Sequence, residues 1–124
     1  MKKIMIVDDE PDQISTFKYV VESSNSDYEI ISVNDGMKCL QLLKNNQIPD
    51  LILLDIMMPN MSGWEVFKRI KEIPSCKDVP IVFLTARTDV MAKKAGSFLG
   101  DDYIEKPFDS QNLLKRINEI LKNR

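Results

Sequence analysis

Three short, almost continuous apolar runs constrain the fold of this chain more than any other feature. They are Ile4–Val7, Leu51–Leu54 and Ile81–Leu84. A run without polar alternation is typical of a strand covered on both faces, as in a parallel sheet flanked by helices. Weaker strands are predicted at Tyr28–Val33 and around Tyr103–Glu105.

The segments between these strands have the spacing of amphipathic helices. Apolar residues recur three and four positions apart in three of them: Ile14, Phe17 and Val21; Val66, Ile70 and Ile73; and Leu113, Ile117, Ile120 and Leu121. Further helices are predicted from Gly36 to Asn45 and from Asp89 to about Phe98, and Pro11 fits the first turn of the first helix.

Strict alternation of buried strands and helices predicts an α/β fold with a doubly wound, five-stranded parallel sheet and five helices. The flavodoxin-like strand order 2-1-3-4-5 is expected, with function at the carboxyl ends of the strands. The chain has 124 residues, no linker and no repeat, so residues 1–124 are predicted to form one domain.

Composition excludes several classes of function. Nineteen acidic residues against 17 basic residues argue against a nucleic-acid surface, and no apolar run is long enough to span a membrane. The chain has no histidine, which excludes Ser-His-Asp and Cys-His mechanisms within it. Cys39 and Cys76 match no metal-binding spacing, so they are interpreted as reduced, packed thiols of a cytoplasmic protein.

Polar residues gather where the predicted strands end. Asp8 and Asp9 follow the first strand, Asp55 the third, Thr85 ends the fourth and Lys106 the fifth. For any single acid, a turn or capping role is the simpler reading, and Glu10 and Asp12 are expected to have that role.

Taken together, the strand-end acids predict a cation site. Three carboxylates on adjacent strand ends repel one another unless a cation is present. Oxygen donors without histidine suit a hard ion, Mg²⁺ or Mn²⁺. Such a site has room for a phosphoryl group, with a lysine and a hydroxyl available to its remaining oxygens.

The motifs resemble the receiver domain of two-component response regulators, of the stand-alone chemotaxis type, over essentially the whole chain. The matching blocks are VDDEP, LILLDIMMPNMSGWE, FLTA and DDYIEKPF. The resemblance implies that Asp55 is the phosphate acceptor, that Asp8, Asp9, Asp55 and the backbone carbonyl of Met57 hold Mg²⁺, and that Thr85 is the switch hydroxyl. It also implies that Lys106 pairs with the phosphate, that the Lys106–Pro107 bond is cis, and that Tyr103 is an aromatic rotamer switch.

The implied function is a phosphorylation-switched signalling module. A histidine kinase or phosphotransfer protein would supply the phosphoryl group, and the chain would catalyse only its own phosphorylation and dephosphorylation. The downstream partner would bind the face of the fourth helix, fifth strand and fifth helix, and a phosphorylation-dependent homodimer is a further implied partner. Gly100 followed directly by Asp101 makes the Thr85–Lys106 connection one residue shorter than in many family members, which leaves the pose of the fourth helix open.

Three alternatives remain. A haloacid-dehalogenase-like phosphatase also forms an aspartyl phosphate, but it needs a second Asp where this chain has Met57. A flavodoxin-type cofactor binder needs a phosphate loop after the first strand, where Asp8, Asp9 and Glu10 would repel phosphate. A constitutive docking domain would not be phosphorylated.

Overall fold

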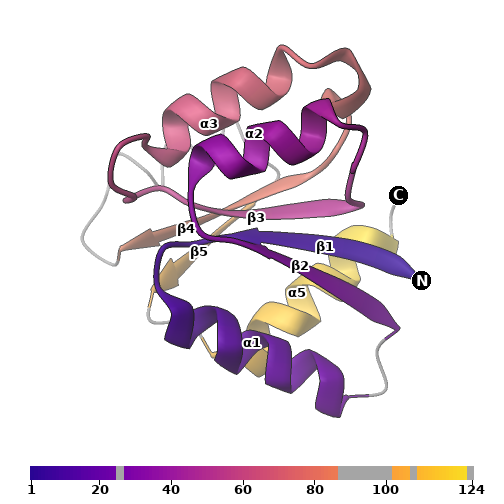
Figure 1. Ribbon diagram of the computed structural model, residues 1–124. Helices are drawn as coiled ribbons and strands as arrows, with labels where there is room; N and C mark the ends of the chain where they lie inside the picture. The colour runs from indigo at the N-terminus through magenta and orange to yellow at the C-terminus, as the bar shows by residue number, and fades with distance from the viewer. Residues whose placement is uncertain (25–26, 87–101, 107–108, 123–124) are drawn as a thin grey trace.

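The structure is a computed structural model that describes residues 1–24, 27–86, 102–106 and 109–122; at Thr85, Ala86, Asp102 and Lys106 it describes only the backbone. One parallel sheet contains five strands in the order β2-β1-β3-β4-β5, which confirms the predicted order (Figure 1). The strands are β1 (Lys2–Val7), β2 (Tyr28–Val33), β3 (Leu51–Asp55), β4 (Ile81–Ala86) and β5 (Asp102–Lys106).

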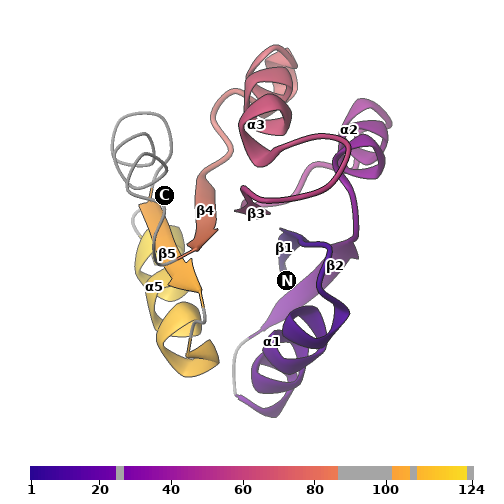
Figure 2. The ribbon, with the colours of Figure 1, turned by 90° about the vertical axis from the view of Figure 1, so that its left-hand side faces the viewer.

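Helices cover both faces of the sheet. The helices α2 (Gly36–Lys44) and α3 (Gly63–Lys71) lie on one face, and α1 (Pro11–Ser23) and α5 (Ser110–Lys122) lie on the other (Figures 1 and 2). A short 3₁₀ helix, Pro74–Cys76, precedes β4. The helix predicted at 89–98 falls outside the described residues. Within the described part of the chain, no helix is long and apolar enough to cross a membrane.

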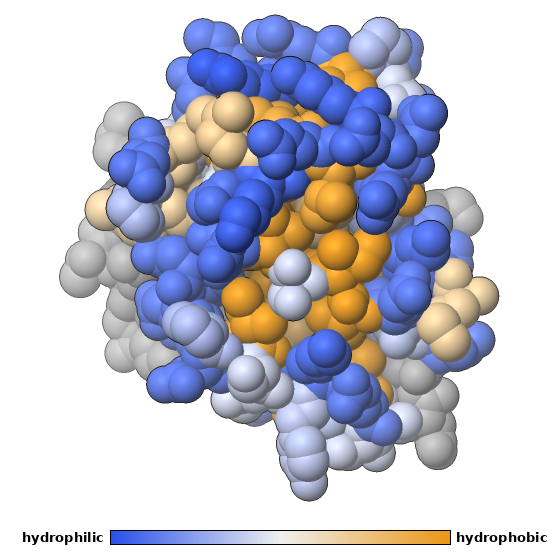
Figure 3. Space-filling model, in the orientation of Figure 1, coloured by the Kyte–Doolittle hydropathy of each residue, from blue (hydrophilic) through white to orange (hydrophobic). Residues whose placement is uncertain are grey.

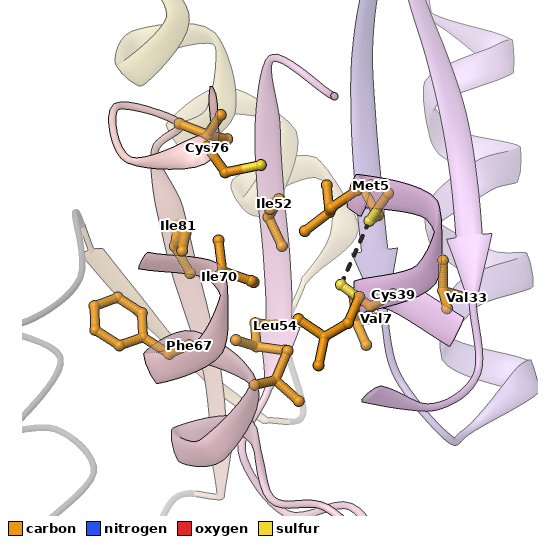
Figure 4. Close-up of a cluster of buried hydrophobic side chains, with 14 of the residues drawn as sticks. Met5, Val7, Val33, Cys39, Ile52, Leu54, Phe67, Ile70, Cys76 and Ile81 are labelled. Carbon is orange, nitrogen blue, oxygen red and sulfur yellow. Dashed lines mark hydrogen bonds between the residues drawn. The ribbon is translucent and has the colours of Figure 1, made fainter. Parts of the chain in front are cut away.

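Alternation along the central strands builds two separate cores. Met5, Val7, Ile52 and Leu54 point into the core under α2 and α3 (Figure 4). Their neighbours Ile4, Ile6, Leu51 and Leu53 belong to the core under α1 and α5. All eight side chains are fully buried. Because both faces of β1 and β3 are apolar, these strands have room for polar chemistry only at their ends.

Both cysteines belong to the core under α2 and α3. Cys39 and Cys76 are buried free thiols, and the Cys39 Sγ lies 3.8 Å from the Met5 sulfur (Figure 4). Burial, and secondarily the neighbouring Cys76, raises the pKa of the Cys39 thiol to about 12. A protonated thiol is a poor nucleophile and metal ligand. Both cysteines are buried among apolar side chains, in keeping with the predicted packing role.

The edge strand β2 lies between α2 and α1. In Figure 3 a hydrophobic band runs along this edge between two hydrophilic helix surfaces. The band contains a groove of about 500 Å³ whose apolar lining comes from Ile14, Val33 and Leu42. Glu29 of β2 forms an ion pair at 3.9 Å with Lys3 of β1.

The end of α2 is fixed by its backbone. Asn46 has a φ of 65°, in the left-handed region. Its N–H donates to the Leu43 carbonyl at 3.1 Å, and the Gln47 N–H donates to the Leu42 carbonyl at 3.0 Å. This pair of bonds is the Schellman motif, which closes a helix through a left-handed residue. The helix therefore ends at Lys44, one residue before the predicted end at Asn45. Asn45 is its C-cap residue.

We expect Asn46→Ala to lower the free energy of unfolding by about 1 kcal/mol, because a Cβ disfavours the left-handed conformation and alanine lacks the compensating amide. Asn46→Gly should be at least as stable as the wild type. Urea unfolding measures both. Asn45→Ala is the matched control, since Asn45 has a φ of −91°. An Asn46→Ala variant as stable as the wild type would contradict the prediction.

Candidate functional site

Four carboxylates meet at the carboxyl ends of β1 and β3. One oxygen from each of Asp8, Asp9, Glu10 and Asp55 lies within 4.8 Å of the others. The sheet register explains this convergence: Val7 pairs with Leu54, so the next residues of the two strands are neighbours. The three aspartates that the sequence predicted to converge are therefore brought together.

Asp8 is fully buried and held from two sides. Its own N–H donates to the Val33 carbonyl at 3.1 Å, which extends the ladder between β1 and β2. Its Oδ1 accepts a bond from the Glu10 N–H at 2.9 Å. This second bond turns the chain toward α1 and fixes the orientation of the carboxylate.

Asp55 is the last residue of β3 and is 2% exposed. Its Oδ1 accepts a bond from the Met57 N–H at 3.2 Å. The Ile56 N–H donates to the Leu84 carbonyl of β4 at 3.1 Å, so the backbone after Asp55 still follows the sheet. The bond from the Met57 N–H to Asp55 places the Met57 backbone beside the acidic cluster, while Met57 as a whole is 67% exposed.

Glu10 joins the cluster although the sequence predicted only a turn or capping role. It does occupy the N-cap position of α1, but its side chain makes no capping hydrogen bond. Its carboxylate instead contributes the fourth oxygen. Three consecutive acids were the only sequence signal, and they do not distinguish a capping carboxylate from one turned toward its neighbours.

The remaining predicted residues lie on β4 and β5. Thr85 pairs in register with Glu105, and Ala86 pairs with Lys106, so Thr85 and Lys106 both lie near the carboxyl edge of the sheet. Tyr103 pairs with Phe83 and packs, half-buried, against the core under α2 and α3. Pro107 lies outside the described residues, as does the cis bond predicted before it.

The cluster fits a divalent cation. Two unit charges 4 Å apart near a protein surface repel by about 4 kcal/mol, so several carboxylates at this spacing are costly without a counter-charge. All four donors are carboxylate oxygens, the ligand type that Mg²⁺ and Mn²⁺ prefer. Asp8 and Asp55 are buried, whereas Asp9 is half-buried and Glu10 exposed, so the cluster can be reached from solvent on one side.

Sequence comparison identifies the family. The sequence profile of the response regulator receiver domain matches residues 4–118. The alkaline phosphatase synthesis transcriptional regulatory protein PhoP of Bacillus subtilis is 37% identical over 122 residues, which are 98% of this chain and 49% of PhoP. The chain belongs to the receiver domains of two-component response regulators. It spans about half the length of the curated relatives it matches.

Solved structures agree with this assignment. The receiver domain of the Francisella response regulator 1452 superposes with a TM-score of 0.85 at 27% identity, covering 99% of this chain and 98% of that one. The Mn²⁺-bound form of the response regulator Rcp1 superposes with a TM-score of 0.81 at 30% identity, covering 97% and 91%. The fold is therefore that of a receiver domain, and one relative of this fold holds a divalent ion.

We expect Asp9→Asn to raise the melting temperature in EDTA, because it removes one charge from the cluster at nearly constant shape. The gain should correspond to roughly 1–2 kcal/mol. Mg²⁺ at millimolar concentration should stabilise the wild type by mass action and the variant much less. Thermal melts of both proteins, with EDTA and with Mg²⁺, measure the effect.

The control is Asp12→Asn, which removes an exposed acid of α1 that the cluster does not contain. It should leave the response to Mg²⁺ unchanged. If Asp9→Asn melts below the wild type in EDTA, mutual repulsion does not govern the cluster. If it gains as much from Mg²⁺ as the wild type, Asp9 does not contribute to ion binding.

Proposed function

We propose that this receiver domain accepts a phosphoryl group on Asp55 and thereby changes the population of its conformations. The observation that carries the proposal is the placement of Asp55: a nearly buried carboxylate at the end of the central strand, within 4.8 Å of three other carboxylates. A nucleophile held in a fixed orientation beside a cation site suits phosphoryl transfer, which depends mainly on positioning and electrostatics.

In the proposed reaction, a carboxylate oxygen of Asp55 attacks the phosphorus of a phosphohistidine in line with the leaving nitrogen. The new O–P bond forms as the N–P bond breaks, and the leaving imidazole keeps the electron pair and takes up a proton. The histidine must belong to a histidine kinase or a phosphotransfer protein, because this chain contains none. The Met57 N–H bond to Oδ1 orients the carboxylate for this attack.

We propose that Asp8, Asp9, Asp55 and the backbone carbonyl of Met57 hold Mg²⁺, with Mn²⁺ as a substitute. When bound, the ion neutralises charge on the carboxylates and on the incoming phosphoryl oxygens. The all-oxygen donor set and the Mn²⁺-bound relative Rcp1 support this assignment. Glu10 is the exposed member of the cluster and is suited to bind an ion through water.

Thr85 and Lys106 are proposed to bind the phosphoryl oxygens, and a cis Lys106–Pro107 bond would direct the lysine toward them. Their strand pairing near the carboxyl edge supports these roles. Tyr103 is proposed as the rotamer switch, since it is half-buried on the strand that carries Lys106. The surface of β5, α5 and residues 89–98 would bind the downstream partner, or a second copy after phosphorylation.

We further propose that residues 1–124 are one domain that catalyses only its own phosphorylation and dephosphorylation. Two buried, unbridged cysteines support a cytoplasmic location. The haloacid-dehalogenase-like alternative is less favoured, because its second catalytic aspartate is replaced here by the exposed Met57. A docking domain that is never phosphorylated would have no use for a nearly buried carboxylate beside three others.

Acetyl phosphate or beryllofluoride with Mg²⁺ should modify one residue, Asp55, and Asp55→Asn should not respond. Intact-mass analysis and peptide mapping measure the modification. The matched control is Asp50→Asn, which removes an exposed acid just before β3 and should leave labelling unchanged. Labelling of Asp55→Asn to the extent of the wild type would refute the assignment.

Thr85→Ala should still accept the phosphoryl group but transmit it poorly, because its hydroxyl is proposed to bind the product and not the metal. Lys106→Ala should lose transmission as well, since a charge-assisted bond is removed. Amide NMR shifts of β5 and α5 on addition of beryllofluoride measure transmission. Shifts of wild-type size in Thr85→Ala would show that the hydroxyl is not the switch.

A further inference from the structure

The first residue of α3, Gly63, lies unusually close to the backbone of Asp55 and Ile56. A Cβ built on Gly63 would lie 2.3 Å from the Asp55 carbonyl oxygen and 2.7 Å from the Cα of Ile56. Among the described residues no glycine has a positive φ, so backbone conformation does not explain why residue 63 is glycine. The close approach of two backbones does explain it.

Hydrogen bonds show what this approach achieves. The Gly63 N–H donates to the Ile56 carbonyl at 2.9 Å, while the Ile56 N–H donates to the Leu84 carbonyl of β4 at 3.1 Å. Both polar groups of Ile56 are therefore held, one by the sheet and one by α3. The residues on either side of it are Asp55 and Met57, which also bond to each other.

We infer that Gly63 is a positioning residue for the acceptor site. Because it has no side chain, the start of α3 can approach and hydrogen-bond the Ile56 carbonyl, and this clamp on Ile56 fixes the Asp55 carboxylate and the Met57 carbonyl. This inference rests on the proposed function, which gives both groups to the metal. A side chain at position 63 must displace α3 or the Asp55–Met57 backbone by roughly 1 Å, a misplacement that can cost about a hundredfold in a positioned reaction.

Gly36 provides a matched comparison. It is also a buried glycine at the first position of a helix, and a Cβ built on it would lie 2.5 Å from the Val66 Cγ2 and 3.2 Å from the Met61 sulfur. These neighbours are side-chain atoms, which can move without shifting the backbone of Asp55. Gly36→Ala therefore introduces a similar steric clash but should not displace the backbone of the acceptor site.

The experiment measures the Mg²⁺ dissociation constant by isothermal titration calorimetry and the rate of phosphorylation by acetyl phosphate. It compares the wild type, Gly63→Ala, Gly36→Ala and Ile70→Ala, the last being a buried α3 residue whose truncation lowers stability. Urea unfolding confirms that each variant is folded during the titration. We expect Gly63→Ala to raise the Mg²⁺ dissociation constant at least tenfold and to slow phosphorylation, whereas the two controls stay within about twofold of the wild type.

Should Gly63→Ala not fold, Ser62→Ala is titrated in its place. Ser62 caps α3 by accepting the Glu65 N–H at 3.4 Å, so its loss loosens the clamp without adding a Cβ at residue 63. It should weaken Mg²⁺ binding by about two- to fivefold, less than the Gly63 change, in line with the modest cost of losing one helix cap. Wild-type affinity in that variant would overturn the inference.

The remaining outcomes separate this inference from the proposed function. If the wild type binds Mg²⁺ and Gly63→Ala binds it equally well, Gly63 serves packing alone and only this inference fails. It also fails alone if Gly36→Ala or Ile70→Ala weakens Mg²⁺ binding as much as Gly63→Ala does. If the wild type itself neither binds Mg²⁺ nor accepts a phosphoryl group, the proposed function fails and this inference fails with it.

Discussion

Burial of β1 and β3 on both faces is the constraint on which the rest of the structure depends. Ile4–Val7 and Leu51–Leu54 are fully buried, and each strand supplies alternate side chains to two cores. An ionised group inside either strand would have to be desolvated, so the first positions that can carry charge are those where the strands end. Parallel pairing then brings these ends to one edge, where the acidic residues that follow β1 and end β3 meet.

The same reasoning explains how much the sequence could predict. Continuous apolar runs and helical spacing are local signals, and they were sufficient for the order β2-β1-β3-β4-β5 and for the convergence of Asp8, Asp9 and Asp55. Side-chain direction is not a local signal. Glu10 occupies the N-cap position of α1, yet its side chain makes no capping hydrogen bond and its carboxylate lies in the cluster.

Backbone proximity is also invisible in the sequence. Gly63 could have been a flexible turn residue, a left-handed residue or a contact residue, and only the placement of α3 against the Asp55 carbonyl distinguishes these roles. The end of α2 is similar, since neither Asn45 nor Asn46 reveals alone which of them adopts the left-handed conformation. The Gly63 contact depends on how elements distant in sequence pack, and the end of α2 depends on which backbone hydrogen bonds close the helix. Periodicity reports neither.

The free energy that the proposed switch requires is comparable to what a few contacts to the phosphoryl group can provide. Phosphorylation of Asp55 would replace about one negative charge by about two, in a position that is only 2% exposed. Reversing a population from 1:99 to 99:1 needs about 5.5 kcal/mol of differential interaction, and one charge pair at 4 Å near the surface contributes about 4 kcal/mol. A charge pair formed in only one of the two conformations, with one further charge-assisted hydrogen bond to the phosphoryl group, would therefore be enough. Since so few contacts suffice, the rigid sheet and both cores need not rearrange. The conformational change can then be limited to the surface near the carboxyl edge of the sheet, including β5 and α5.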